Sequence, residues 1–137
     1  MNVPAGGSEP WKLSSPPDNG TPTPGRIALG PDGNLWFINY RDADGFLVTR
    51  LTPSGTFTDF PIAGGTFMGD ITTGPDGNLW LTEQDANKIA RLSPSNGIVT
   101  EYSVPTPDSQ PTGITAGPDG NIWFTEDRAS KIGRFTP

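Results

Sequence analysis

The 137-residue chain contains no cysteine and no histidine. Without cysteine it has no disulfide framework and no thiolate nucleophile, and its cellular compartment is left undetermined. Without histidine it lacks the side chain that is best suited to acid and base chemistry near neutral pH. No apolar run approaches the ~18 residues of a transmembrane helix. The first ten residues lack the basic and apolar regions of a signal peptide, and we expect residues 1–10 to be flexible.

Positive charge is also scarce. Nine Lys and Arg stand against 15 Asp and Glu, the net charge is −6, and no basic cluster is present. Nucleic acid and anionic membrane surfaces are therefore not expected partners. Only 32% of the residues are hydrophobic, and the 18 Gly and 16 Pro would allow a disordered chain. They stand, however, at fixed offsets between short apolar runs, which is typical of turns between strands.

What the chain does have is a repeat. The stretch GPDGNLW begins at Gly30 and again at Gly74, and GPDGNIW begins at Gly117, so the copies are 44 and 43 residues apart. Within each stretch, Pro presets φ for the first corner and Asp-Gly supports the positive φ of a tight hairpin. The repeat therefore predicts one hairpin turn in each copy.

Strand-like runs follow the same order in every copy when the copies are aligned at this turn. First runs lie at 26–29, 70–73 and 113–116, second runs at 35–38, 79–82 and 122–125, and third runs at 48–51, 89–92 and 132–135. Fourth runs end at 60–62 and 102–104, and the third copy has none. Residues 11–13, Trp-Lys-Leu, have the same aromatic-x-aliphatic form as these fourth runs, so we expect them to supply the closing outer strand.

Four antiparallel strands repeated at this period predict an all-β fold, a β-propeller with three four-stranded blades over residues 11–137. A solenoid β-helix is the structural alternative. Its coils are shorter, and it would not need a tight Asp-Gly hairpin in every unit.

The repeated units resemble the blades of streptogramin B lyases, the virginiamycin B lyase family. The resemblance is carried by GPDGNIWFTE at 117–126, GPDGNLWLTE at 74–83 and KIGR at 131–134. It implies a seven-bladed propeller in a longer chain, which opens a cyclic depsipeptide antibiotic by Mg-dependent elimination. It also implies that histidines and a glutamate act at the mouth of the central channel.

The chain departs from that family pattern by having three blades and no histidine. The resemblance points to the Glu after the tryptophan strand, which is Glu83 or Glu126 here and Asn39 in the first copy. A buried Glu would serve as a general base only if its pKa were raised. We therefore predict no catalytic residue, no enzyme activity and no cofactor. The alternative is a Mg-dependent lyase in which Glu83 and Glu126 hold the ion.

Links between second and third strands of a propeller lie on one rim, around the channel. The candidate ligand-binding residues on this rim are Asn39, Tyr40, Arg41, Glu83, Gln84, Asp85, Glu126, Asp127 and Arg128. Facing carboxylates would suit Mg²⁺ or Ca²⁺, and the alternative is a set of solvated loop ends. The recurring Trp36, Trp80 and Trp123 are predicted to pack between blades. The recurring Arg50, Arg91 and Arg134 are predicted to bond to turn carbonyls or to the turn aspartates.

Three blades cannot close into a ring without exposing apolar faces and a strand edge. We expect a homodimer with six blades, in which Trp11 and Leu13 of one subunit pair with Lys131, Ile132 and Phe135 of the other. A nine-bladed trimer and a fragment of a larger propeller remain open. The function hypotheses are a self-assembling scaffold or binding module for an unidentified small molecule, and the lyase alternative.

Overall fold

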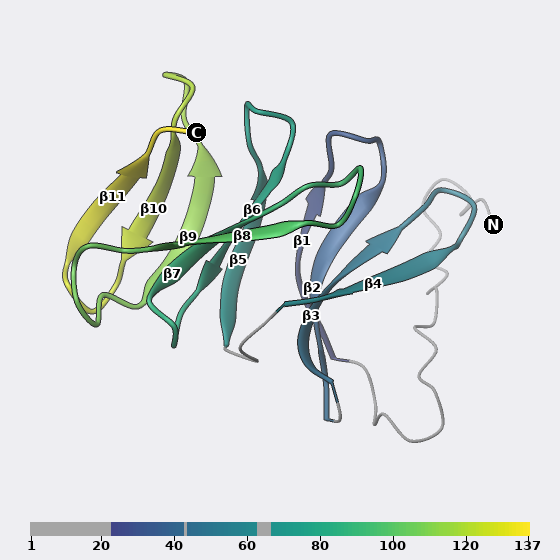
Figure 1. Cartoon of the computed structure of the whole chain (residues 1–137), viewed down its shortest axis with the longest axis horizontal. Helices are drawn as coiled ribbons and strands as arrows, with labels where there is room; N and C mark the ends of the chain where they lie inside the picture. The colour runs from purple at the N-terminus through teal and green to yellow at the C-terminus, as the bar shows by residue number, and fades with distance from the viewer. Residues whose placement is uncertain (1–22, 43, 63–66) are drawn as a thin grey trace, which may run out of the picture.

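Three antiparallel sheets follow one another along the chain in the computed structural model, which describes residues 23–42, 44–62 and 67–137 (Figure 1). The first sheet has the order β1 (Thr23–Leu29), β2 (Leu35–Arg41), β3 (Gly45–Leu51) and β4 (Phe57–Pro61). The second has β5 (Met68–Thr73), β6 (Leu79–Glu83), β7 (Lys88–Leu92) and β8 (Val99–Ser103). The third has β9 (Pro111–Ala116), β10 (Ile122–Glu126) and β11 (Lys131–Phe135).

These sheets confirm the all-β fold and the predicted blade-like unit. The first strands begin two or three residues before the predicted runs, and the fourth strands end one residue earlier than predicted. The third sheet has three strands within the described residues, which correspond to the three runs of the third copy. The predictions for residues 1–10 and 11–13 lie outside the described residues. None of the described residues forms a helix that could cross a membrane.

The repeated GPDGN turn is built around the tryptophan that follows it. Asp32 Oδ1 accepts a hydrogen bond of 2.9 Å from Trp36 Nε1, and Asp32 Oδ2 accepts one of 2.8 Å from Asn34 Nδ2. A methyl group at Gly30 would lie 2.3 Å from Cδ1 of the same indole, so only glycine fits there. Gly33 has a φ of 78°, the left-handed region that favours glycine. The same contacts recur in the other two copies.

In the described part of the chain, the recurring arginines do not bond to the turn aspartates, which were one of the two predicted partners. They form no ion pair with the turn aspartates within the described residues, because the tryptophan indoles occupy those carboxylates. Each guanidinium lies over a tryptophan ring instead, at 5.7 Å for Arg50, 5.9 Å for Arg91 and 5.7 Å for Arg134. The arginines thus stabilise the tryptophan side of each sheet through cation–π contacts.

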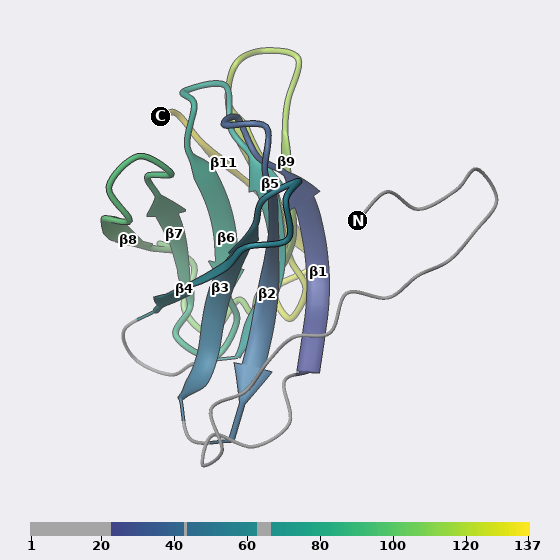
Figure 2. The same cartoon turned by 90° about the vertical axis from the view of Figure 1, so that its right-hand side faces the viewer.

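Successive sheets pack face to face, one behind another (Figure 2). Trp36, Ile38 and Val48 of the first sheet pack against Leu81 and Ala90 of the second. Trp80 and Ile89 on the other face of the second sheet pack against Ile114 and Phe124 of the third. Trp36 and Trp80 are completely buried, which confirms that these two pack between blades. Trp123 is half-buried, on the outward face of the third sheet.

Inner strands β1, β5 and β9 lie side by side and share one irregularity. In each of these strands, two residues lie opposite a single residue of the partner strand. That single residue is Ile38 in β2, Thr82 in β6 and Thr125 in β10. Such a bulge bends a strand at the end of a sheet. Thr82 connects the second and third sheets at this bulge. Its Oγ1 accepts a hydrogen bond of 3.0 Å from the Asp70 backbone N–H and donates one of 2.7 Å to the Thr112 carbonyl.

Candidate functional site

All three links from second to third strands lie at the lower end of the sheets in Figure 1, opposite the GPDGN turns. The candidate residues at the ends of β2, β6 and β10 therefore share one rim, as predicted from strand order. The bulges of β1, β5 and β9 lie at the same end, because Pro24, Met68 and Pro111 pair with Asn39, Glu83 and Glu126. The rim is thus where the backbone is least regular.

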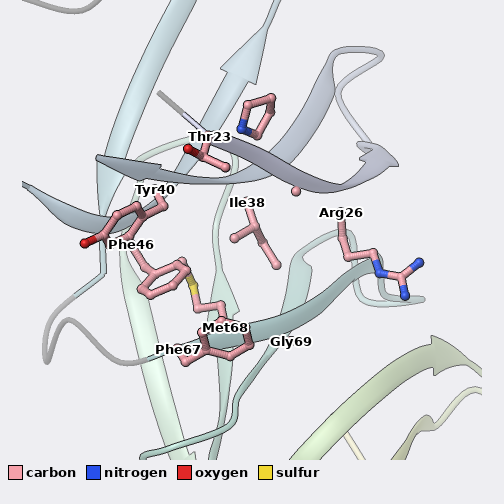
Figure 3. A pocket seen from close by; sticks show the side chains of 10 residues that line it. Thr23, Arg26, Ile38, Tyr40, Phe46, Phe67, Met68 and Gly69 are labelled. Carbon is pink, nitrogen blue, oxygen red and sulfur yellow. The ribbon is translucent and has the colours of Figure 1, made fainter. Parts of the chain in front are cut away.

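A cleft of about 610 Å³ opens on this rim between the first and second sheets (Figure 3). Its walls are mainly apolar: the side chains of Ile38, Tyr40, Phe46, Phe67 and Met68 line it. Thr23, Pro24, Gly25, Arg26 and Gly69 complete the lining. Tyr40 and Arg26 lie at opposite ends of the cleft in Figure 3. The cleft has the size and the lining of a site for a small organic molecule.

Three aromatic side chains form one wall of the cleft. The Tyr40 and Phe46 ring centroids are 4.9 Å apart, and those of Phe46 and Phe67 are 5.2 Å apart in an edge-to-face arrangement. Phe67 is 50% exposed and Tyr40 is 37% exposed, so both rings present surface to a ligand. Because Phe67 precedes β5 and the other two rings belong to β2 and β3, this wall joins the first two blades.

Among the predicted rim residues of the first blade, only Tyr40 lines the cleft. Asn39 is completely buried, and its Nδ2 lies 3.4 Å from Thr49 Oγ1. Arg41 is 5% exposed and forms an ion pair of 2.6 Å with Asp59. These two residues thus belong to a polar network on the opposite face of the first sheet from Ile38 and Tyr40.

Glu83 of the second blade is a buried carboxylate. It is completely buried, and neither carboxylate oxygen has a hydrogen-bond donor among the described residues. Burial, and then the nearby negative charge of Glu101, raise the pKa of Glu83 to about 7. A protonated Glu83 can donate to Glu101, which also accepts a bond of 2.7 Å from Lys88 Nζ. Glu83 therefore keeps its proton to a higher pH than an exposed glutamate does.

The other rim residues have separate surroundings. Gln84 connects the second and third blades. Its backbone N–H donates to the Phe67 carbonyl of the second blade at 2.8 Å, and its side-chain Nε2 donates to Thr112 Oγ1 of the third blade at 3.2 Å. Asp85 and Arg128 are exposed. Glu126 and Asp127 line a second, smaller hollow of about 360 Å³ on the third blade. The nine predicted residues thus share a rim but do not converge on one site.

Magnesium, which the family resemblance implies, needs several oxygen ligands around one point. No three acidic, histidine or cysteine side chains in the described part of the chain cluster closely enough to hold a metal. Glu83 shares a sheet face with Leu81, in the contact between the first two blades. Glu126 shares a face with Phe124, in the contact between the second and third. The described residues therefore do not fit a shared magnesium site.

The sequence analysis missed most of the cleft. Nine of its ten lining residues were not predicted, and Phe46, Phe67 and Met68 are the most prominent of these. One signal was present in the sequence. The link of the first copy is flanked by Tyr40 and Phe46, whereas the corresponding residues are Gln84 and Asn87 in the second copy and Asp127 and Ser130 in the third. An aromatic pair at one copy of a polar link indicates a local apolar surface.

Comparison with known proteins supports the arrangement described above. Solved structures that the chain resembles include virginiamycin B lyase from Staphylococcus aureus, with 42% identity and a TM-score of 0.74 over 83% of this chain and 38% of that one. A catalytically inactive histidine-to-alanine variant of that enzyme, crystallised with quinupristin, gives 42% identity and a TM-score of 0.72 over 81% of this chain and 37% of that one. A streptogramin B lyase structure gives 33% identity and a TM-score of 0.68 over 83% and 40%.

The chain therefore spans about two fifths of the length of these structures. No curated protein matches it significantly. The family model described as the virginiamycin B lyase family matches residues 4–137, which include every described strand. Together with the fold and the repeated turn, this match shows that the chain belongs to the virginiamycin B lyase family.

Proposed function

We propose that this chain is a ligand-binding β-propeller module that holds an apolar, ring-containing small molecule in the rim cleft and has no lyase activity of its own. The main support is the cleft itself. Its volume of about 610 Å³ and its wall of Tyr40, Phe46 and Phe67 suit a molecule that presents aromatic or aliphatic rings. Quinupristin is the first ligand to test, because a family member was crystallised with it.

Two observations support binding without turnover. The S. aureus variant that lost one histidine is described as catalytically inactive, and this chain contains no histidine. Family membership and the raised pKa of Glu83, which suits a general base, favour the lyase alternative. A base must come within hydrogen-bonding distance of the proton that it removes, however, and Glu83 is completely buried.

Binding can be measured by titration calorimetry with quinupristin. We expect saturable binding to the full chain and about tenfold weaker binding to Phe67→Ala, because truncating a half-exposed wall residue removes apolar contact without emptying the core. Ile98→Ala is the matched control. Ile98 is a large apolar residue that is 61% exposed and does not line the cleft. Absent binding, or equal affinities of the two variants, would contradict the proposed site.

Turnover is tested separately. Quinupristin incubated with the chain and Mg²⁺, and in parallel with EDTA, is analysed chromatographically for opening of its ring. We expect no turnover in either sample. Metal-dependent opening that is lost in Glu126→Gln would replace the binding module with the lyase alternative.

We also propose that the module assembles as a homodimer by exchange of residues 11–13. The described part of the chain supplies no strand to the outer edge of β11. Ile132 on that strand is 65% exposed, whereas the corresponding Val48 and Ile89 are 0% and 2% exposed. An added strand and a further blade would cover this apolar surface. Light scattering that gave a stable monomer would contradict the assembly.

A further inference from the structure

The rim cleft lies at one of two equivalent boundaries between blades. The first strands of the first two blades have their bulge at the same place, opposite Ile38 in one blade and Thr82 in the other. Three residues of the first blade that line the cleft therefore have counterparts in the second blade. Arg26, Ile38 and Tyr40 correspond to Asp70, Thr82 and Gln84.

These three counterparts form hydrogen bonds across the boundary between the second and third blades. Thr82 Oγ1 donates to the Thr112 carbonyl at 2.7 Å, and Gln84 Nε2 donates to Thr112 Oγ1 at 3.2 Å. Asp70 Oδ2 accepts from the backbone N–H of Ile114 at 3.3 Å. Polar side chains of the second blade thus hold the inner strand of the third blade at the rim.

The residues of the first blade cannot form the same bonds. Ile38 has no polar side-chain atom, and Arg26 is only a donor, so it cannot accept from a backbone N–H as Asp70 does. The first two blades are hydrogen-bonded at the opposite end of their inner strands, where Thr73 Oγ1 donates to the Leu29 carbonyl. Their boundary is therefore closed near the GPDGN turns and open at the rim, which is where the cleft lies.

The open boundary carries one positive charge. Arg26 is the only charged residue among the described residues that line the cleft, although the chain has 15 Asp and Glu. Arg26 is exposed, and it forms no ion pair with any part of the chain that the structure describes. It lies at the opposite end of the cleft from Tyr40 (Figure 3). The cleft thus has an aromatic end and a cationic end.

We propose that the rim cleft selects ring-containing carboxylates, with the ring against the aromatic wall and the carboxylate on the Arg26 guanidinium. This inference rests on the proposed ligand-binding function and adds the chemical class of the ligand. A guanidinium presents two parallel N–H donors to a carboxylate, and this charge-assisted pair is stronger than a neutral hydrogen bond. The ring supplies most of the apolar contact, and the carboxylate fixes the orientation of the ligand.

The net charge of the chain makes this preference a demanding one. A chain with a charge of −6 repels anions at long range. An acid that binds more tightly than its neutral analogue must therefore meet a cation at close range. Arg26 is the cation that lines the described part of the cleft.

The probes are naphthylbutyrate and its primary amide, which share a ring and a chain length but differ in charge. Each probe is titrated calorimetrically into the full chain at low salt. We expect the acid to bind about tenfold more tightly than the amide, because only the acid forms a charge-assisted pair. Arg26→Gln should abolish the difference by weakening the binding of the acid alone. Arg26→Glu should reverse the preference, so that naphthylbutylamine binds more tightly than naphthylbutyrate.

Arg128→Gln is the matched control. Arg128 is an exposed arginine of the third blade that does not line the cleft, and its replacement changes the net charge by the same amount as Arg26→Gln. This variant should keep the preference for the acid. Thermal unfolding of Arg26→Gln should match that of the natural chain, since Arg26 is exposed.

The outcomes separate this inference from the proposed function. Equal binding of the acid and the amide, with both weakened in Phe67→Ala, would leave the ring-binding cleft in place and overturn the preference for a carboxylate. A preference for the acid that persists in Arg26→Gln would also overturn it, because the carboxylate would then bind elsewhere. Absence of binding by both probes would overturn the inference alone if quinupristin binds, and the proposed function as well if quinupristin does not.

Discussion

One aspartate in each turn explains why the same letters surround the tryptophan in all three copies. Asp119 Oδ1 accepts from Trp123 Nε1 at 2.9 Å, and Oδ2 accepts from Asn121 Nδ2 at 2.8 Å. These bonds lower the pKa of Asp119 to about 2, so the carboxylate stays ionised except in strong acid. Gly117 leaves room for the indole, and Gly120 takes the positive φ of the turn. The turn thus holds the indole of one tryptophan through its aspartate and leaves room for it at its first glycine.

Glu83 makes the stability of the fold depend on pH. Its pKa is raised, whereas that of Asp119 is lowered. Burial and the charge of Glu101 raise the pKa of Glu83 from 4.5 to about 7, whereas the unfolded chain returns it to about 4.5. The folded chain therefore holds a proton that the unfolded chain releases between these values. The stability contributed by neutral Glu83 is complete below pH 4.5 and is lost as the pH rises to about 7.

Glu83→Gln should remove the loss of stability that accompanies ionisation of Glu83. Glutamine cannot ionise, and its amide can donate to Glu101 as the protonated acid does. We expect the variant to have a higher urea midpoint than the natural chain at pH 8 and a similar midpoint at pH 4.5. The exposed Asp127→Asn corrects for the removal of one negative charge. A variant that is less stable than the natural chain at pH 8 would mean that ionised Glu83 has a favourable partner.

Elements that depend on local chemistry could be predicted from the sequence. The alternating apolar runs and the Asp-Gly turns specify the strands, because hairpin geometry is decided within a few residues. The bulges of β1, β5 and β9 and the aromatic wall of the cleft could not be predicted in this way. Phe67 and Phe46 are 21 residues apart and meet only after two blades pack together. The pKa of Glu83 likewise depends on burial between blades, which no local pattern reveals.

The bulge of β5 sets how closely the second and third blades approach. A methyl group at Gly69 would lie 2.7 Å from Thr82 Oγ1 and 2.9 Å from the Thr112 carbonyl, the two atoms of the hydrogen bond that joins these blades. Gly69→Ala must therefore displace the backbone of β9. We expect a loss of about 2 kcal/mol in the free energy of unfolding, measured by urea denaturation.

Gly25→Ala is the matched control for this change. Gly25 occupies the same bulge position in β1, and an added methyl group would meet only ordinary contacts, the nearest at 3.6 Å from the Ile38 carbonyl oxygen. Its stability should stay close to that of the natural chain. Equal losses in the two variants would indicate that the bulge itself, and not the approach of β9, requires glycine.

At the scale of the whole molecule, each blade buries one face on the next, and the third blade has an outward face without a described neighbour. Ile132 on this face and Ile27 on β1 are 65% and 59% exposed, although their equivalents Ile89 and Ile71 are 2% and 4% exposed. The two ends of the row of blades thus expose apolar positions that interior blades bury. Their exposure is the physical reason to expect association between copies.

Trp11→Ala tests whether association uses strand exchange. Trp11 lies outside the described residues, and its role is predicted from its aromatic-x-aliphatic context. Loss of a large buried aromatic side chain should weaken the dimer by about 3 kcal/mol, or about two orders of magnitude in its dissociation constant. Trp11→Phe keeps a ring and should retain most of the affinity. Sedimentation over a range of concentrations separates the outcomes: an unchanged dimer in Trp11→Ala would exclude this strand as the connection, because no other aromatic residue precedes β1 in the sequence.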